Sequence, residues 1–404
     1  MMNKVVNKFK TVGIFETIKW GIRGAYNKTV KVCVLTYFPK YKQGNLDFFK
    51  KTIKEKISNE KNVYIFAGVP FYDIGGGQRS AQLAKVFSKL KYNVFYFYTY
   101  DTNSKIFDME IPTVMHKYLG AFSTKHFNEL VKSNDICIFE FPSKKMLPYL
   151  NIAYKHNAKI VYENIDNWET NLGGSNFNEY ALKELLNKAS IITGTAKPLV
   201  EQIYMYFEKY GIKGKKVLYS PNAVNNELFN PDTKYSKPDD LIIGEKTLIY
   251  YGSLWGSWFD WNLIFDVAKK HSEFSINLIG DYKDIKDIVE KSPQNVHYLG
   301  LKKQSDLPAY LTYSDIALLP FKVDEIGLYV SPVKIFEYIS MNKIILATPL
   351  PDITGYPNTF TGITSKEWMD ILNKNLKPDK SSRDKFITDN NWHNRCINII
   401  KKIN

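Results

Sequence analysis

The sequence has few cysteines and no long hydrophobic run, and both absences exclude classes of protein. Cys33, Cys137 and Cys396 are the only cysteines among 404 residues, and they form no C-x-x-C pair or zinc-type spacing with histidine. This excludes a disulfide framework and a zinc-finger-type site, and it favours a reducing, cytoplasmic setting. No apolar run reaches the about 18–20 residues that cross a bilayer, and residues 1–20 lack a signal-peptide pattern. The sequence predicts a protein that is neither secreted nor membrane-spanning.

Metal-binding patterns are also missing. The six histidines form no metal-ligand spacing, and the chain has no D-x-D motif. A diphosphate ligand is therefore expected to be neutralised by lysine, arginine and helix ends rather than by a chelated metal ion. No metal site is predicted.

Positive charge is concentrated at the start of the chain. Residues 1–60 hold 13 Lys or Arg against 4 Asp or Glu, which is +9 of the net +14. Apolar residues recur there at helical spacing among the lysines, although Gly13 and Gly21 weaken the pattern. Two interpretations stay open: an amphipathic helix on an anionic membrane surface, or a helix packed on the body of the protein. Nucleic-acid binding is not favoured, because the segment has neither a zinc-ligand pattern nor an RNP-type motif.

Short β-branched and aromatic runs alternate with helical patterns along the chain, as in α/β proteins with parallel sheets. Strands are predicted at 62–67, 93–98, 135–139, 159–162, 190–193 and 216–219, and helices at 78–90, 144–156, 178–188 and 197–210. After the polar stretch 230–240 the alternation restarts, with strands at 247–251, 274–279, 295–298, 315–320 and 343–347. This predicts two Rossmann-like, doubly wound parallel-sheet domains that face each other across a cleft. The expected division is a basic segment at 1–60, domains at 61–230 and 231–382, and a closing helix at 383–404.

Residues 331–341 have the pattern of a helix with one apolar and one charged side. Ser331 favours the N-cap and Pro332 the first helical position, which leaves free N–H groups where an anion could bind. Lys334 and Glu337 lie about 60° apart, away from the apolar residues. A nucleoside diphosphate needs such groups together: amides and a lysine for the phosphates, and a carboxylate for the ribose hydroxyls. The alternative is a solvated Lys–Glu pair worth about a few tenths of a kcal/mol.

The run GLYVSPVKIFEYISMNKIILATPLPD resembles the donor-binding signature of GT-B glycosyltransferases, especially family-4-type enzymes that build teichuronic acid and capsular polysaccharides. Other segments agree in the expected order: GGGQRSAQLAKVF (75–87), VYENIDNWE (161–169), LYSPNAVNNELFNP (218–231), YYGSLWGSWFDW (250–261), INLIGD (276–281) and VHYLGLKKQSDLPAYL (296–311). The resemblance covers about residues 62–400. It implies an acceptor site in the first domain, a donor site with Lys334 and Glu337 in the second, and a closing helix that crosses back to the first domain.

One position departs from the family pattern. Many family-4 enzymes have a second Glu eight positions before the one matched by Glu337, and Tyr329 stands there in this chain. The role of that carboxylate near the transferred sugar is unfilled, or it is taken by Asp324 or Glu325. The retaining mechanism common in that family therefore does not follow from the resemblance.

A glycine-rich loop follows the first predicted strand. Gly76 and Gly77 lack a Cβ, so their backbone could approach a phosphate or a sugar closely, and Gln78 and Arg79 open the next helix. Arg79 is the candidate phosphate contact. The alternative is a plain turn whose arginine pairs with a carboxylate.

Polar residues also follow the strand predicted at 159–162. Asp166 is the candidate general base that deprotonates an acceptor hydroxyl if the reaction inverts. Glu163 and Trp168 are candidate acceptor contacts, Trp168 through its flat apolar face. The alternative is that Asp166 caps a helix or turn and that Trp168 belongs to the core.

The loop after the strand predicted at 247–251 is rich in tryptophan. Gly252 and Ser253 are candidates for approaching the diphosphate, and the Trp-Phe-Asp run that ends at Asp260 would border the nucleotide. The alternative is that the tryptophans only pack.

Together these features predict a metal-independent glycosyltransferase of the hexosyltransferase class. It would move a sugar from a nucleoside-diphosphate-sugar donor, without a cofactor, to a glycan or lipid-linked glycan in capsule or cell-wall polysaccharide biosynthesis. It is expected in the cytoplasm, peripheral on the inner face of the cell membrane. Two alternatives remain: a sugar-nucleotide 2-epimerase of the same fold, and a catalytically degenerate protein that binds a nucleotide sugar or polysaccharide.

Overall fold

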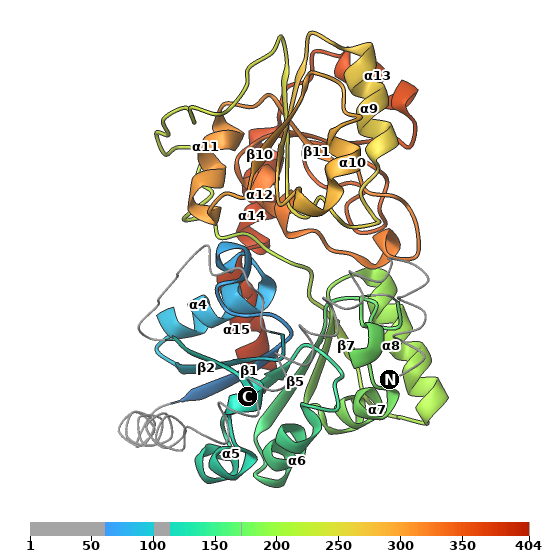
Figure 1. The fold of residues 1–404 in the computed structure, drawn as a ribbon. Helices are drawn as coiled ribbons and strands as arrows, with labels where there is room; N and C mark the ends of the chain where they lie inside the picture. The colour runs from blue at the N-terminus through green and yellow to red at the C-terminus, as the bar shows by residue number, and fades with distance from the viewer. Residues whose placement is uncertain (1–60, 101–113, 171, 404) are drawn as a thin grey trace, which may run out of the picture. The chain divides into compact units, whose positions relative to one another are not determined.

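The structure is a computed structural model that describes residues 61–100, 114–170 and 172–403. They form two parallel α/β sheets, of seven and six strands, within one unit of the chain (Figure 1). The predicted α/β class with two doubly wound parallel sheets is confirmed. The basic segment at 1–60, with its predicted amphipathic helix and Cys33, lies outside the described residues.

The seven-stranded sheet has the order β3-β2-β1-β4-β5-β6-β7. Its strands are β1 (Asn62–Ala67), β2 (Asn93–Tyr98), β3 (Val114–Tyr118), β4 (Ile136–Phe139), β5 (Lys159–Asn164), β6 (Ile191–Gly194) and β7 (Val217–Tyr219). The helices between them are α4 (Arg79–Lys89), α5 (Thr124–Leu130), α6 (Leu147–Lys155), α7 (Glu179–Lys188) and α8 (Lys197–Tyr210), with short 3-10 turns η1 (Asp73–Gly76), η2 (Leu119–Ala121) and η3 (Gly174–Asn176). β1 is buried along its whole length, as expected of a parallel strand covered on both faces.

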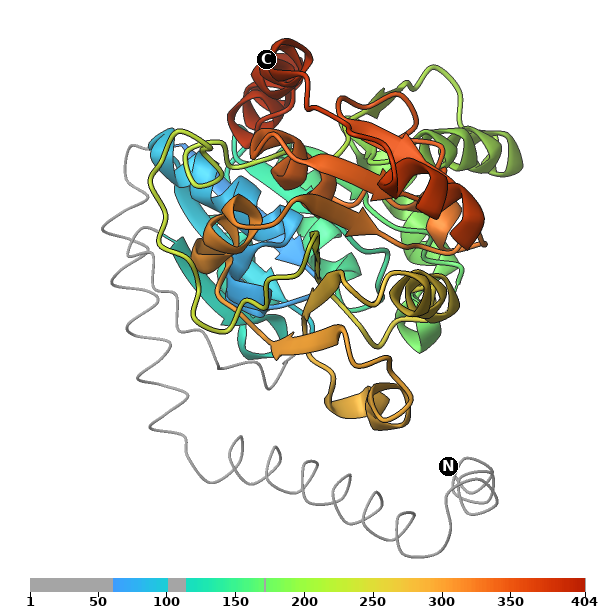
Figure 2. The same ribbon diagram turned by 90° about the horizontal axis from the view of Figure 1, so that it is seen from above.

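The six-stranded sheet has the order β10-β9-β8-β11-β12-β13. Its strands are β8 (Thr247–Tyr251), β9 (Ser275–Ile279), β10 (Val296–Gly300), β11 (Ile316–Leu319), β12 (Ile344–Ala347) and β13 (Thr359–Thr361). Its helices are α9 (Trp261–Lys270), α10 (Lys286–Val289), α11 (Leu307–Thr312), α12 (Val333–Ser340) and α13 (Ser365–Leu372), with 3-10 turns η4 (Lys283–Ile285), η5 (Gln304–Asp306) and η6 (Gly327–Tyr329). Figure 2 shows the same elements from above.

Each sheet has a point where the strand order reverses. β1 pairs with both β2 and β4, and β8 pairs with both β9 and β11. Crevices at the carboxyl ends of such strands are where open α/β sheets bind ligands. A ligand site is therefore expected among the loops after β1, β4, β5, β8 and β11.

The C-terminal segment is two helices rather than the single closing helix expected at 383–404. α14 (Lys380–Asp389) packs on α12, where Phe386 stacks on Phe336 with ring centres 5.7 Å apart. α15 (Trp392–Ile403) packs on α4 beside the first sheet (Figure 1). Trp392 and Ile399 belong to the buried cluster of that sheet. Only α15 makes the contact that was expected of the whole segment.

No helix in residues 61–100, 114–170 and 172–403 is long and apolar enough to cross a bilayer.

Candidate active site

The helix that carries Lys334 begins one residue later than the sequence indicated. α12 starts at Val333 with Pro332 in the N-cap position, and no side chain caps it. The Ser331 hydroxyl instead accepts a hydrogen bond from the backbone N–H of Asn222 at 3.2 Å. The Asn222 amide donates back to the Ser331 carbonyl oxygen at 2.5 Å. Ser331 therefore joins α12 to the segment after β7 and does not cap the helix.

The Lys334 ammonium lies between aromatic rings and a glycine. Its Nζ is 5.1 Å from the ring centre of Tyr250 and 4.9 Å from that of Phe321. Gly252, with φ +138°, lies so close that an added Cβ would be 2.9 Å from Nζ. Burial lowers the pKa of Lys334 to about 8, against the opposing effect of Glu337. No residue of the described ranges accepts a hydrogen bond from this ammonium, so an anion would find an unpaired cation here.

Glu337 is buried, with 4% of its surface exposed, and does not lie on a solvated face. The Tyr251 hydroxyl donates to Oε2 at 2.8 Å, and the Gln304 amide donates to Oε1 at 3.0 Å. Burial raises the pKa of this carboxyl, while the two hydrogen bonds and Lys334 lower it. Because a carboxylate oxygen has more than one lone pair, both oxygens can still accept a ligand hydroxyl.

The two polar candidate residues of the loop after β8 differ in role. The Ser253 hydroxyl is buried without a hydrogen-bond partner in the described part of the chain, as a group left for a ligand would be. Asp260 caps α9, because its Oδ1 accepts from the Leu263 N–H at 3.1 Å. Trp255 in the same loop is 61% exposed. The structure thus gives Asp260 a capping role, and only Ser253 stays open as a ligand contact.

The glycine loop is fixed by the helix that it opens. Gly76 has φ +71°, a conformation that glycine adopts without strain. Its carbonyl oxygen accepts from the Gln82 amide at 2.7 Å and from the Lys85 ammonium at 2.8 Å. Gln78 is the N-cap of α4 and makes no side-chain capping bond. Gly77, between them, is half-buried.

Arg79 and Glu163 form a buried ion pair with 3% and 0% of their side chains exposed. The guanidinium donates from Nε and Nη2 to the two carboxylate oxygens, each at 2.8 Å. Its remaining N–H groups reach Ser220 Oγ, the Pro221 carbonyl oxygen and Asn222 Oδ1 at 3.0, 3.1 and 3.3 Å. No N–H is left for a phosphate. The expected phosphate contact by Arg79 and acceptor contact by Glu163 are therefore corrected to a bracing role for the segment after β7.

Asp166 stands two residues beyond the end of β5 and is half-buried. No described residue donates a hydrogen bond to its carboxylate, and desolvation raises the pKa of Asp166 to about 7. It does not take the capping role that was its alternative. A carboxyl with that pKa and a free lone pair suits a general base near neutral pH.

Glu140 is a residue that the sequence analysis missed. It directly follows β4, is 2% exposed, and has an Oε1 atom with no hydrogen-bond partner in the described chain. Burial and the nearby Glu163 raise its pKa to about 8, while Arg79 and Ser80 lower it and Asp166 raises it. The signal was an acidic residue placed directly after an apolar strand, the position that also drew attention to Glu163.

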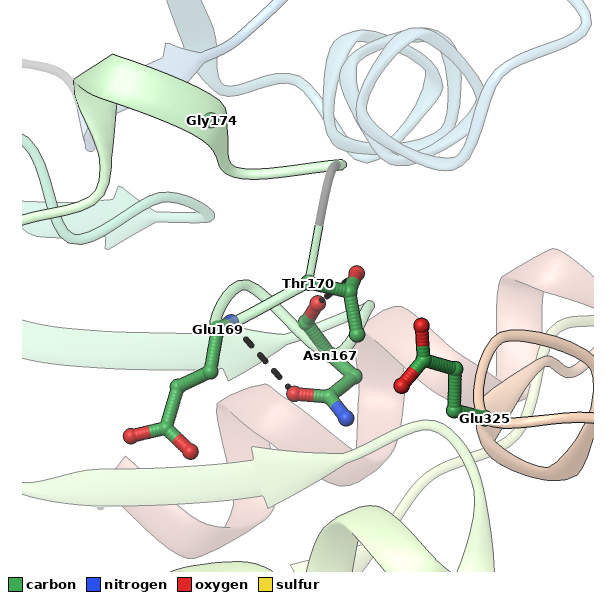
Figure 3. A pocket seen from close by; sticks show the side chains of 5 residues that line it. All are labelled: Asn167, Glu169, Thr170, Gly174 and Glu325. Carbon is green, nitrogen blue, oxygen red and sulfur yellow. Dashed lines mark hydrogen bonds between the residues drawn. The ribbon is translucent and has the colours of Figure 1, made fainter.

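A polar pocket of about 510 Å³ is lined in part by Asn167, the residue that follows Asp166 in the chain. It is lined by Asn167, Glu169, Thr170, Gly174 and Glu325. Figure 3 shows Glu325 pointing from the loop after β11 toward Asn167 and Thr170. Glu325, one of the two candidates for the missing family carboxylate, thus faces this pocket, whereas Asp324 Oδ1 accepts from the backbone N–H groups of residues 326 and 327.

Trp168 does not line this pocket. Its ring packs edge-on against Phe141, with centres 4.6 Å apart, and its Nε1 is buried without a hydrogen-bond partner in the described chain. Trp168 is half-buried, and its contact with an acceptor stays a prediction.

Comparisons with known proteins agree with this architecture. No family model matches the chain. Over 228 residues the chain is 24% identical to TuaH of Bacillus subtilis (strain 168), whose name assigns it to teichuronic acid biosynthesis as a glycosyltransferase; the match spans 53% of this chain and 55% of TuaH. A glycosyltransferase from Rickettsia africae ESF-5 has a similar structure, with a TM-score of 0.62, 15% identity, and coverage of 85% of this chain and 98% of that one. Anabaena HepE in complex with UDP gives a TM-score of 0.53, 14% identity, and coverage of 85% and 96%.

Two parallel α/β sheets and these structural relatives define the class: the chain has the GT-B fold of glycosyltransferases. More particularly, it is a distant homologue of TuaH, and the match spans about half the length of that relative.

Proposed function

We propose that the protein transfers a sugar from a nucleoside-diphosphate sugar to a hydroxyl of a glycan or lipid-linked glycan. The observation that carries this proposal is the Lys334 ammonium, which lies against Gly252 at the switch point of the second sheet without an acceptor in the described chain. A diphosphate placed there would supply the hydrogen-bond acceptors that this ammonium lacks. UDP is the first nucleotide to test, because HepE was crystallised with UDP.

The donor would be held by residues of the second sheet. Lys334 and the Ser253 hydroxyl face the diphosphate, and Glu337 accepts hydrogen bonds from the ribose hydroxyls. Lys334 supplies positive charge at the leaving diphosphate, so we propose transfer without a bound metal ion. Activity that is unchanged by EDTA is the expected outcome.

Asp166 would act as the general base. The acceptor hydroxyl gives its proton to the carboxylate, its oxygen forms the bond to the anomeric carbon, and the bond from that carbon to the diphosphate breaks. The diphosphate leaves with the electron pair beside Lys334. This single displacement inverts the anomeric carbon, and it does not need the family carboxylate that Tyr329 replaces.

We propose that the acceptor binds in the polar pocket described above. The pocket lined by Asn167, Glu169, Thr170 and Glu325 offers amide, hydroxyl and carboxylate groups, which suit the hydroxyl groups of a sugar. We further propose that residues 1–60, with a net charge of +9, hold the enzyme on an anionic membrane where a lipid-linked acceptor would be found. Cell-surface polysaccharide biosynthesis is the setting suggested by the name of TuaH.

A binding screen over nucleoside diphosphates and their sugars tests the donor site. Calorimetry should find one preferred nucleotide, and Glu337→Ala should weaken its binding by about 1.5–3 kcal/mol, the scale for a charged hydrogen-bond partner. Asp306→Asn, an exposed substitution outside the site, should bind as the wild type does. Equal affinity of the wild type and Glu337→Ala would remove Glu337 from the donor site.

A further inference from the structure

Two buried side chains, Gln82 and Gln304, connect the glycine loop to the carboxylate of Glu337. Gln82, in α4, donates from Nε2 to the Gly76 carbonyl oxygen at 2.7 Å and to Gln304 Oε1 at 3.1 Å. Gln304, in η5, donates from Nε2 to Glu337 Oε1 at 3.0 Å. Gln82, Gln304 and Glu337 are 2%, 7% and 4% exposed. The chain of bonds therefore runs through the protein interior from the first sheet's α4 to the second sheet's α12.

The direction of this chain is fixed by its ends. An ionised Glu337 can only accept, so Gln304 must turn its NH₂ group toward Glu337 and its oxygen toward Gln82. Gln82 then uses both N–H bonds, one to Gln304 and one to Gly76. Flipping either amide would leave a buried donor facing a donor or an acceptor facing an acceptor, which costs about 1–3 kcal/mol per unmade bond. The two amides thus hold one arrangement.

Lys85 makes a second connection between the same two places. Its ammonium donates to the Gly76 carbonyl oxygen at 2.8 Å. Burial lowers the pKa of Lys85 to about 8, and the charge of Glu337 raises it. A change in the charge or hydrogen bonding of Glu337 is therefore felt at the glycine loop through Lys85 as well as through the amides.

We propose that Gln304 is a positioning residue for the nucleotide-binding carboxylate of Glu337. We also propose that Gln82 couples nucleotide binding at Glu337 to the order of the glycine loop at Gly76–Gln78. This coupling rests on the proposed donor site. A ribose hydroxyl bonded to Glu337 strengthens one arrangement of the chain of bonds, so the loop becomes more ordered when nucleotide is bound. Since coupling between two sites is reciprocal, a ligand that orders the loop also tightens nucleotide binding.

Two methionine variants separate the halves of the connection, because methionine has a similar length and cannot make the amide bonds. Gln304→Met removes the hydrogen bond to Glu337 Oε1. It should weaken UDP binding about tenfold in calorimetry, the effect of one lost hydrogen bond to a charged group. Gln82→Met leaves the Gln304–Glu337 bond in place and should keep UDP affinity within about threefold. Ser305→Ala, exposed and next to Gln304, is the matched control with wild-type affinity.

Hydrogen exchange then reads the coupling itself. In the wild type, UDP should slow exchange of the backbone amides in residues 76–82 and around α12. In Gln82→Met, UDP should protect α12 as in the wild type but should protect residues 76–82 much less, because only the connection through Lys85 remains. Equal protection of the loop in Gln82→Met and wild type would overturn the coupling.

The pH dependence of UDP binding distinguishes positioning from a purely structural role. Glu337 faces Lys85 from α4, Tyr251 from β8, and Lys334 and Tyr338 from its own helix. The Gln304 hydrogen bond lowers the pKa of Glu337, so its removal raises that pKa. Because Glu337 must be ionised to accept from the ribose hydroxyls, UDP affinity is lost as the pH drops and Glu337 becomes protonated. In Gln304→Met the midpoint of this loss should lie at a higher pH than in the wild type. An unshifted midpoint, or unchanged affinity in Gln304→Met, would overturn the positioning role alone. Wild-type protein that binds no UDP would overturn the donor site and the coupling together.

Discussion

The Lys334 ammonium and Gly252 are in such close contact that an added Cβ at position 252 would lie 2.9 Å from Nζ and 2.8 Å from Cε. The glycine is therefore required by the position of the lysine as well as by its φ of +138°. The absence of a Cβ at position 252 leaves room for the ammonium at the carboxyl end of β8, where a diphosphate is proposed to bind.

Gly252→Ala should consequently displace Lys334 and weaken UDP binding about tenfold. It should also lower the free energy of unfolding by about 1–3 kcal/mol, because an alanine is strained at this φ. Gly355→Ala is the matched control: Gly355 has φ +87°, and an added Cβ there meets nothing within 4 Å. The control should lose stability without losing affinity, and a similar loss of UDP affinity in both variants would contradict the account.

Asp166 leads to a prediction about pH. Its pKa of about 7 reflects desolvation, and a general base must be ionised, so kcat/KM should fall about tenfold per pH unit as the pH drops below 7. Asp166→Asn should abolish transfer while UDP binding, measured in the same preparation, stays unchanged. Substantial transfer by Asp166→Asn would assign the base to another residue.

Glu140 leads to a prediction about stability. Its carboxyl has a pKa raised from 4.5 to about 8 by burial, so the unfolded chain releases this proton at lower pH than the folded chain. The folded state loses stability as the pH rises across that interval, and the loss is complete above pH 8. Glu140→Gln removes this titration. The melting temperature of the variant minus that of the wild type should therefore increase as the pH is raised from 5 to 8.5. A difference in melting temperature that stays constant with pH would show that Glu140 does not carry a raised pKa.

The sequence predicted most of the fold because its buried strands are continuous apolar runs. The strands predicted at 62–67, 93–98 and 247–251 have the observed bounds of β1, β2 and β8. β3 and β13 were missed: β3 contains His116 and Lys117, and β13 has only three residues, none of them aliphatic. Position at a sheet edge does not by itself explain these misses, because the edge strands β7 and β10 were predicted.

The site was predicted less well, because a residue type does not say which neighbour it finds. Lys334 and Glu337 were expected from helical spacing, but the sequence could not show that Glu337 is buried and held by Gln304, 33 residues away. Arg79 and Glu163 are 84 residues apart in the chain, and no local sequence pattern predicts that they pair. Glu140 was overlooked although it directly follows an apolar strand, because its burial beside Arg79 and Glu163 depends on contacts between distant segments.

The contact between α15 and α4 should be important for stability. Ile399 is fully buried in the cluster of the first sheet, and Ile399→Ala should lower the free energy of unfolding by about 2–5 kcal/mol. Asn398→Ala, on the exposed side of the same helix, should change it little.

Removal of α15 should also abolish transfer. The Arg395 guanidinium donates from Nε to the Pro221 carbonyl oxygen at 2.8 Å, and Arg79 donates to the same oxygen. The segment that holds Ser331 through Asn222 would lose this support. A protein truncated before Trp392 with wild-type stability and activity would contradict this role.

The most direct measurement is the transfer of a labelled sugar. The full chain is incubated with a panel of labelled nucleotide sugars, starting with UDP-sugars, with and without a lipid-linked glycan extract. We expect label to move from one donor to the extract, with release of the nucleoside diphosphate, only when the extract is present and not with Asp166→Asn. Conversion of one nucleotide sugar into another without the extract, or binding of nucleotide with no turnover in any combination, would contradict the proposed transfer.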